Sequence, residues 1–261
     1  MKFILPLLLA IVSFSAFTAP KSELWPYWNT SNESSTDSVD HQAWQQLLDQ
    51  YLVSKGDYTL FKYSSVSEKD KLALAKYLEI LAKTDPLSLN KAQQYAYWVN
   101  LYNAITVKLI LDDYPVKSIT KLGGLFSFGP WGDDVITING KTLTLNDIEH
   151  RILRPIWQDP RTHYAVNCAS LGCPNLQHNV FTAENTEMLL EQAATSFINS
   201  DKGVFVTKDN SPQLSSIYDW FSVDFGDKAS LIKHLSHYRP DLATLDGKFS
   251  YDYDWSLNES K

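Results

Sequence analysis

The stretch NKAQQYAYWVNLYNAITVKLILDD (90–113) decides the fold that we expect for this chain of 261 residues. It contains no Gly or Pro, and apolar residues at helical spacing surround nearly its whole circumference, which predicts one helix from about residue 90 to 112. A helix that is apolar nearly all round is buried, so the domain should pack around it. Within it, Asn100 and Asn103 either tie the helix to neighbouring backbone or line a cleft.

The segments on either side of this helix supply further helices and only a few short strands. Asn139-Gly140 lies between two alternating segments, and because this dipeptide favours positive φ twice it predicts a β-hairpin over 135–145. The whole set predicts a single-domain α+β fold, with helices packed on a small, mainly antiparallel sheet. The other predicted elements are helices at about 41–52, 68–83, 148–153, 185–199 and 228–237, and strands at 162–166, 203–207 and 247–257.

The first 19 residues, MKFILPLLLAIVSFSAFTA, predict a secretory signal peptide. Lys2 precedes an apolar run that is shorter than the ~20 residues of a membrane-spanning helix, and small residues follow it near the expected cleavage site at 16–20. Residues 20–39 are rich in Ser, Asn and acidic residues, so we expect a mobile tether there and one globular domain over 40–261. The protein should therefore be exported, to the periplasm or beyond the cell.

The charge of the chain narrows the class of partner. The formal net charge is −7, and −8 without the signal peptide. An acidic domain lacks the basic face that phosphate backbones require, so we expect no nucleic-acid partner, and no later segment is apolar enough to span a membrane.

No phosphate-binding loop, dinucleotide fingerprint or Gly-x-Ser-x-Gly elbow is present, and we predict no cofactor. The expected ligand is an unidentified small molecule or peptide.

Both cysteines lie in one stretch, RTHYAVNCASLGCPNLQHN (161–179), whose first part alternates like a strand over Thr162–Val166 and then becomes loop-like. Reactive groups on a loop at the end of a strand are typical of functional sites. One hypothesis for this stretch is a structural disulfide between Cys168 and Cys173. A turned loop brings two such Cα atoms within the ~7 Å that a disulfide needs, and an exported protein meets oxidising conditions.

A second hypothesis makes Cys168 a nucleophile. A cysteine nucleophile needs a base that lowers its pKa and a third group that orients the base. His163 and His150 are the candidate bases, and Glu149 is the candidate orienting residue. Side chains five apart in a strand point to opposite faces, so pairing His163 with Cys168 requires a bend at Asn167, whose amide could also donate to an oxyanion.

Two further hypotheses concern metal and redox chemistry. Two histidines and two cysteines form a zinc-type ligand set, but their even five-residue spacing matches no usual zinc finger, so we assign no metal site. A thiol–disulfide redox centre is the other alternative, although the spacer is wider than in a Cys-x-x-Cys motif. The four residues of the metal hypothesis are His163, Cys168, Cys173 and His178.

Several motifs in chain order resemble the domain-of-unknown-function 547 family. These motifs are YWVNLYNA (97–104), IEHRILRP (148–155), HYAVNCASLGCPNL (163–176), IYDWFSVDFG (217–226) and YDWSLN (253–258). The resemblance covers roughly residues 90 to 258 and implies a fold distantly similar to papain- and transglutaminase-like cysteine hydrolases. It implies no activity, since the family name carries none.

Together these features predict a cleft in which the end of the 162–166 strand meets the helix with Glu149–His150 and the Asn100–Asn103 face of the long helix. An enzyme built there would be a cysteine-dependent hydrolase or acyl transferase acting on a peptide or amide. The rival class is a non-catalytic binding or scaffold domain whose Cys168–Cys173 disulfide is structural. The residues that we expect to line the cleft or bind substrate are Asn100, Asn103, Arg154, Arg161, Asn167 and Ser170.

Overall fold

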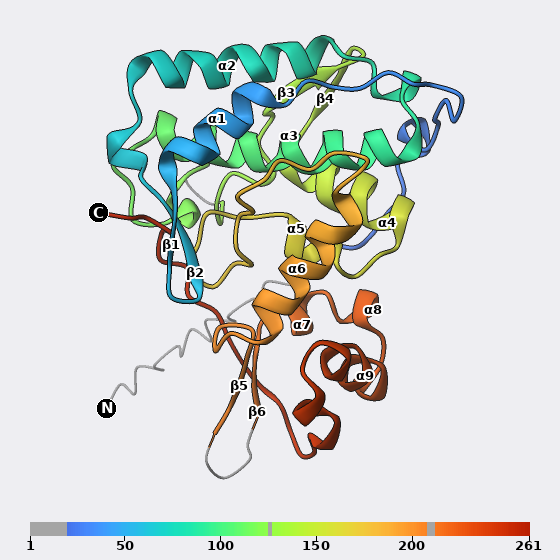
Figure 1. Ribbon diagram of the computed structural model, residues 1–261, viewed down its shortest axis with the longest axis vertical. Helices are drawn as coiled ribbons and strands as arrows, with labels where there is room; N and C mark the ends of the chain where they lie inside the picture. Colours follow the sequence, from blue (N-terminus) through green and yellow to red (C-terminus); the bar gives the residue numbers. More distant parts are fainter. Residues whose placement is uncertain (1–19, 125–126, 208–211) are drawn as a thin grey trace, which may run out of the picture.

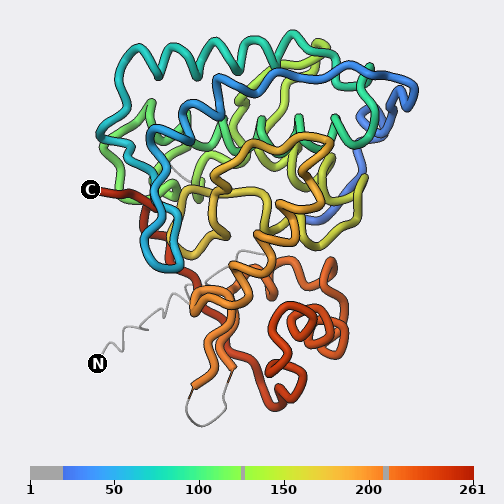
Figure 2. The backbone as a smooth tube through the Cα atoms, in the orientation of Figure 1, coloured from blue at the N-terminus to red at the C-terminus, as the bar shows by residue number. Residues whose placement is uncertain are grey.

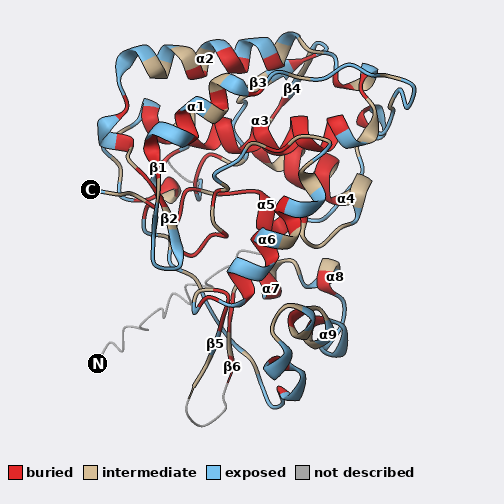
Figure 3. Cartoon of the chain, viewed as in Figure 1, coloured by how far each residue is buried: buried red, intermediate tan, exposed pale blue. Residues whose placement is uncertain are grey.

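A computed structural model describes residues 20–124, 127–207 and 212–261, so the predicted signal peptide at 1–19 lies outside the described residues. The predicted long helix is confirmed as α3 (Lys91–Asp112), and the side chain of Asn90 caps it by accepting from Gln93 N at 2.9 Å. Most of its side chains are buried, and it runs through the middle of the domain (Figure 3). Nearly complete apolar coverage is what places it there.

Two helices pack over one side of α3: α1 (Gln42–Tyr51) and α2 (Glu68–Lys83) (Figure 1). The predicted start of α2 is confirmed, because Ser67 caps it by accepting from Asp70 N at 3.2 Å. In the sequence, the two helices are connected by an antiparallel hairpin of β1 (Leu52–Lys55) and β2 (Tyr58–Phe61).

The hairpin predicted over 135–145 is also confirmed. It consists of β3 (Ile136–Ile138) and β4 (Lys141–Leu143), paired antiparallel. Asn139 and Gly140 have φ of 50° and 68°, the left-handed conformation that both central residues of this turn require.

The predicted strand at Thr162–Val166 is wrong. The helical turns η5 (Asp147–Leu153) and α4 (Arg154–Trp157) are followed by another helical turn, α5 (Thr162–Ala165). Every residue of α5 is buried, with 4% exposure or less. Alternation marks a strand only when one face meets solvent, so in a segment packed on all sides the pattern carries no such information.

Buried residues between 193 and 245, together with Tyr164, form a second, smaller core, which lies below the long helix in the view of Figure 1. A small sheet of order β5-β6-β7 supports it, in which β5 and β6 are antiparallel and β6 and β7 are parallel. Its elements are α6 (Thr186–Ile198), β5 (Val204–Val206), β6 (Pro212–Ser215), α7 (Ile217–Trp220), α8 (Ser222–Phe225), α9 (Lys228–Tyr238) and β7 (Ser250–Asp252). The described residues thus confirm the single-domain α+β class with small, mostly antiparallel sheets.

Residues 20–39 pack against the domain, in contrast to the mobile tether that we predicted. Trp28 is fully buried, with its ring 5.2 Å from that of Trp98 in α3. The backbone N–H groups of Glu23 and Trp25 donate to the carbonyls of His150 and Arg151, each at 3.0 Å. The segment runs along the outside of the domain from α4 towards α1 (Figure 2). The apolar surface that its aromatic residues bury offsets the conformational entropy lost when this polar segment is ordered.

Within the described ranges, none of the helices combines the length and the apolar character needed to cross a bilayer.

Candidate functional site

A cavity of about 430 Å³ lies where η5, α5, the cysteine loop and the C-terminal segment meet. Five of the residues selected from the sequence line it: Glu149, His150, His163, Cys168 and Cys173. Seven of the fifteen other described residues that line it are aromatic. The aromatic residues of the wall are Tyr102, Phe128, Trp131, Trp220, Phe221, Tyr253 and Trp255.

The long helix holds the backbone that leads to Cys168. Asn103 Nδ2 donates to Ala165 O at 2.9 Å, and Asn103 Oδ1 accepts from Asn167 N at 2.8 Å. The chain then turns at Ala169, whose φ of 57° is a conformation that few residues other than Gly adopt. This turn follows Cys168, so it is not the bend predicted at Asn167, and a bend there was required only if Thr162–Val166 were a strand, whereas Thr162–Ala165 is helical.

The C-terminal segment pairs with the cysteine loop. Leu171 N and Gly172 N donate to Ser256 O and Asp254 O, each at 2.8 Å. Gly172 is needed at this close approach, since a Cβ atom there would lie 2.7 Å from Asp254 N. This pairing places Tyr253 beside Cys168.

The Cys168 sulfur lies within hydrogen-bond distance of two hydroxyl groups. Ser170 Oγ is 3.1 Å from the sulfur and Tyr253 OH is 2.9 Å from it. Burial is the largest influence on the pKa of Cys168 and raises it, but hydrogen bonds from Cys173, Ser170 and Tyr253 together lower the pKa below its usual value. Burial raises the pKa of Cys173 well above its usual range. Cys168 is therefore the more readily ionised of the two thiols.

His163 is held by Asp224. Its Nε2 lies 2.7 Å from Asp224 Oδ2, and its ring stacks on Phe221 with 4.2 Å between centroids. Arg154 Nε donates to the same carboxylate oxygen at 2.6 Å. Burial raises the pKa of Asp224, but hydrogen bonds from His163 and Arg154 outweigh it and bring the pKa to about 2. The ionised carboxylate accepts a hydrogen bond from Nε2–H, which leaves the lone pair of His163 on Nδ1.

In His150 the nitrogen that accepts a hydrogen bond from a neighbouring residue is Nδ1, whereas in His163 Nε2 donates one. Arg154 Nη1 lies 3.0 Å from His150 Nδ1, and because a guanidinium only donates, Nδ1 accepts. Burial lowers the pKa of His150 to about 4, so the ring is neutral at pH 7 with its proton on Nε2. His150 can therefore donate a hydrogen bond from Nε2 but offers no basic nitrogen, which makes His163 the candidate base.

Glu149 is the orienting residue proposed from the sequence, but its carboxylate is not within hydrogen-bond distance of either histidine ring. Its Oε1 lies 3.8 Å from Nδ1 of His150 and 3.8 Å from Nδ1 of His163. Asp224, at 2.7 Å, is the residue that orients His163. Burial and the Glu149 carboxylate raise the pKa of Tyr102, whose hydroxyl is hydrogen-bonded to Glu149.

The two cysteines are free thiols in this structure, so the predicted Cys168–Cys173 disulfide is not formed in it. Cys173 Sγ instead accepts a hydrogen bond from the backbone N–H of Cys168 at 2.9 Å.

The four residues of the metal hypothesis do not converge, because His178 is exposed and its Nε2 contacts Ser54 Oγ at 2.8 Å. Within the described residues, no group of three or more His, Cys, Asp or Glu is placed to hold a metal ion.

None of the other residues assigned to the cleft lines the cavity, although Ser170 contacts the Cys168 sulfur. Asn100 is hydrogen-bonded through its amide to both backbone groups of Phe181, at 2.7 and 3.1 Å. Asn167 Nδ2 donates to Pro174 O at 2.7 Å, so this amide shapes the loop and is not free to bind an oxyanion. Arg154 is buried and contacts Asp224, His150 and Pro20 O.

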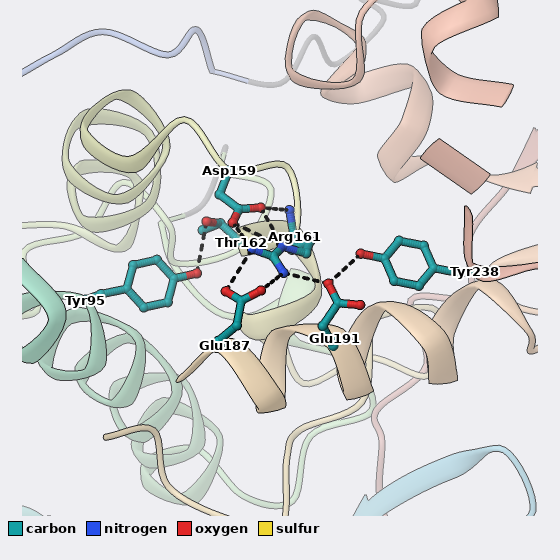
Figure 4. Close-up of polar contacts among 7 residues, drawn as sticks. All are labelled: Tyr95, Asp159, Arg161, Thr162, Glu187, Glu191 and Tyr238. Carbon is teal, nitrogen blue, oxygen red and sulfur yellow. Dashed lines mark hydrogen bonds and ion pairs between the residues drawn. The ribbon is translucent and has the colours of Figure 1, made fainter. Parts of the chain in front are cut away.

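Arg161 does not line the cavity and lies in a separate ion cluster (Figure 4). Its guanidinium contacts three carboxylates: Asp159 at 2.7 Å, Glu187 at 2.6 Å and Glu191 at 2.6 Å. Tyr238 OH donates to Glu191 at 3.0 Å. These contacts connect α6 and α9 to the loop before α5, so the role of Arg161 is to hold elements together.

We expect Arg161→Met to lower the free energy of unfolding by about 1–3 kcal/mol while leaving the cavity intact, because three carboxylates lose their shared cation and repel one another. Chemical denaturation at low and high salt measures this effect, and salt should reduce it. Arg239→Met is the matched control, since Arg239 pairs with the single exposed carboxylate of Asp241 and should cost less. An equal loss of unfolding free energy in the two variants would show that Arg161 stabilises the protein no more than a single exposed ion pair does.

Sequence reasoning missed Asp224 and Tyr253 as members of the site. Both were visible in the motifs IYDWFSVDFG (217–226) and YDWSLN (253–258), which were used only for the family resemblance. Asp224 looked like one acidic residue among aromatic neighbours, and nothing local indicates that a residue 61 positions away contacts His163.

Comparison with known proteins gives one family match. The model of the family described as "Protein of unknown function, DUF547" matches residues 86–198, a segment that contains α3, η5, α5 and both cysteines. The two C-terminal motifs of the sequence resemblance lie beyond the matched residues, and no curated protein and no solved structure matches the chain. The proposed distant likeness to papain- and transglutaminase-like hydrolases stays a prediction. Residues 86–198 of this chain are therefore similar to the DUF547 family of proteins of unknown function.

Proposed function

We propose that this protein is a cysteine-dependent hydrolase or acyl transferase that acts on a peptide or another amide. Cys168 is the nucleophile, Nδ1 of His163 is the base and Asp224 orients His163. The observation that carries the proposal is the surroundings of Cys168: two hydroxyl groups at 2.9 and 3.1 Å from its sulfur, in the cavity that His163 also lines. Hydrogen bonds to a thiolate favour its formation, and the thiolate is the reactive form.

The chemistry proceeds in two steps. The Cys168 sulfur attacks the amide carbon, its proton passes to His163 Nδ1, and the C–N bond breaks as His163 returns that proton to the leaving amine. A thioester to Cys168 remains. Water or an acceptor amine then attacks the thioester carbon, gives a proton to His163, and releases the acyl product and the thiol. His150, with its proton on Nε2, is the donor available for the carbonyl oxygen.

An activated ester tests the first step. Incubation with p-nitrophenyl acetate should release p-nitrophenolate in a burst and add one acetyl group, which peptide mapping should place on Cys168 and not on Cys173. Cys168→Ala should remove the burst, and His163→Gln should slow it by about 10²–10⁴-fold. His178→Gln is the matched control, because His178 is exposed and lies outside the cavity. Acetyl groups on lysine alone, or none at all, would refute the proposal.

Alkylation by iodoacetamide tests the role of the hydroxyl groups. Because these groups lower the pKa of Cys168, its alkylation should persist below the pH at which an ordinary thiol stops reacting. A hydrogen bond to a charged group contributes about 1.5–3 kcal/mol, so Tyr253→Phe should slow alkylation at about pH 6.5 roughly tenfold. Tyr251→Phe removes the same atom from an exposed ring two residues away and should change nothing. Equal rates in both variants would exclude Tyr253 as the stabilising donor.

We also propose that the protein is exported. The support is the pattern of residues 1–19, which read as a secretory signal peptide. Expression with and without these residues, followed by fractionation and N-terminal sequencing, tests this. An intact N-terminus on protein retained in the cytoplasm would overturn it.

A further inference from the structure

The aromatic wall of the cavity contains rings that hold one another in place. Trp255 lies 5.6 Å from Trp220, nearly parallel to it, 5.6 Å from Trp131 and 4.5 Å from Tyr253, centroid to centroid. These side chains are half-buried, so part of each ring remains accessible. Aromatic faces carry a partial negative charge that attracts cations, and rings fixed in advance bind a ligand without a cost of ordering.

Glu149 adds a buried negative charge to the same cavity. It is only 6% exposed, Tyr102 is hydrogen-bonded to it, and His163 Nδ1 lies 3.8 Å from it. Within the described residues, no lysine or arginine forms an ion pair with it. The neighbouring imidazole of His150 is neutral at pH 7, because burial lowers its pKa to about 4. Arg154 is engaged by Asp224, His150 and Pro20 O.

A buried carboxylate without a counter-ion is costly. An apolar ligand would increase that cost, since it would displace water from Glu149 and supply no charge. A ligand with a positive charge would offset it and would also gain from the aromatic faces.

We propose that this cavity binds an organic cation, an ammonium group of the substrate, with Glu149 as its counter-ion and the rings of Trp131, Trp220 and Trp255 as its walls. The inference deepens the proposed function by assigning a cationic group to the substrate of the same site. The binding itself requires no reaction at Cys168.

Two probes of one shape test the charge. Choline and 3,3-dimethyl-1-butanol differ only in a quaternary nitrogen in place of a carbon, and titration calorimetry on the intact chain compares them. Choline should bind at least about tenfold more tightly, the size expected of a desolvated cation on aromatic faces. Neopentylamine, a primary ammonium of similar bulk, distinguishes an amine substrate from a quaternary one.

Three variants locate the binding. Glu149→Gln should reduce the preference for choline over its neutral analogue to what the aromatic faces alone contribute, whereas Glu187→Gln, the same change at the Arg161 cluster, should not reduce it. Trp220→Leu should weaken choline about tenfold. If Glu149→Gln fails to fold, the comparison of choline with its analogue on the unaltered protein still decides the question.

Equal binding of the two probes would show an apolar cavity without charge selection and would overturn the proposal, as would a lack of binding by both ammonium probes. Cys168→Ala separates this inference from the proposed function. It should lose acetylation by p-nitrophenyl acetate and keep choline binding. Cation selectivity in a protein that never forms the thioester would refute the catalytic proposal alone, and thioester formation without cation selectivity would refute the binding proposal alone.

Discussion

Asp224→Asn should lower the rate of Cys168 acylation by about 10²–10⁴-fold, comparable to the loss when a serine protease loses the aspartate that orients its histidine. Asp224 Oδ2 accepts from His163 Nε2 at 2.7 Å and so keeps the basic lone pair on Nδ1. An amide can present its N–H₂ to the ring and favour the other tautomer. The burst with p-nitrophenyl acetate, measured for both proteins over a range of pH, checks this.

The same substitution should also affect stability. Folding depresses the pKa of Asp224 from 3.8 to about 2, so its contribution is complete above pH 3.8 and is lost as the pH falls towards 2. Asp224→Asn removes this contribution and leaves the buried guanidinium of Arg154 without its anion, which costs about 3–5 kcal/mol. Asp219→Asn, an exposed carboxylate in the same segment, is the matched control. Unchanged acylation in a folded Asp224→Asn protein would remove Asp224 from the mechanism.

The second large effect is expected in acid: the domain should unfold cooperatively as the pH falls from about 6 to 4. Burial lowers the pKa of each of three histidines, His41, His150 and His234, from 6.5 to about 4. A histidine whose pKa is depressed by folding stabilises the fold above pH 6.5, and that stability is lost as the pH falls towards 4. Each histidine can cost on the order of 2–3 kcal/mol at pH 4, and three together approach the ~5–15 kcal/mol that stabilises a typical domain.

Circular dichroism during an acid titration, together with proton uptake on unfolding, measures this. His41→Gln should move the transition to lower pH, because an amide can keep the contact with Tyr77 OH that His41 Nδ1 makes at 2.6 Å and does not take up a proton. His178→Gln, at an exposed histidine, should leave the transition unchanged. A domain that stays folded below pH 4 would contradict the prediction.

The long helix and the hairpin at 135–145 were predictable because their signals are local. Apolar coverage and the Asn90 cap define α3, and the Asn139-Gly140 dipeptide defines the turn. The strand predicted at 162–166 failed for a physical reason. A buried single turn of helix leaves no exposed face, so the alternation there had no relation to solvent.

The candidate site was predictable in part. The sequence placed Glu149, His150, His163 and Cys168 in one cleft, and the structure brings all four to one cavity. The roles of these residues depend on contacts between distant segments, such as Asp224 with His163. Which residue orients a histidine is a question of distance in space, and no local pattern reports that distance.

The pairing of the cysteine loop with the C-terminal segment has a consequence for biosynthesis. Tyr253 is made roughly 85 residues after Cys168, which at ~5–20 residues per second is roughly 4–17 s later. During that interval the nascent chain carries both thiols without the segment that positions Tyr253 at the Cys168 sulfur. Oxidation of the two cysteines should therefore compete with folding chiefly in newly made chains, and a reducing agent should raise the yield of active protein if it is present during folding but not if it is added afterwards.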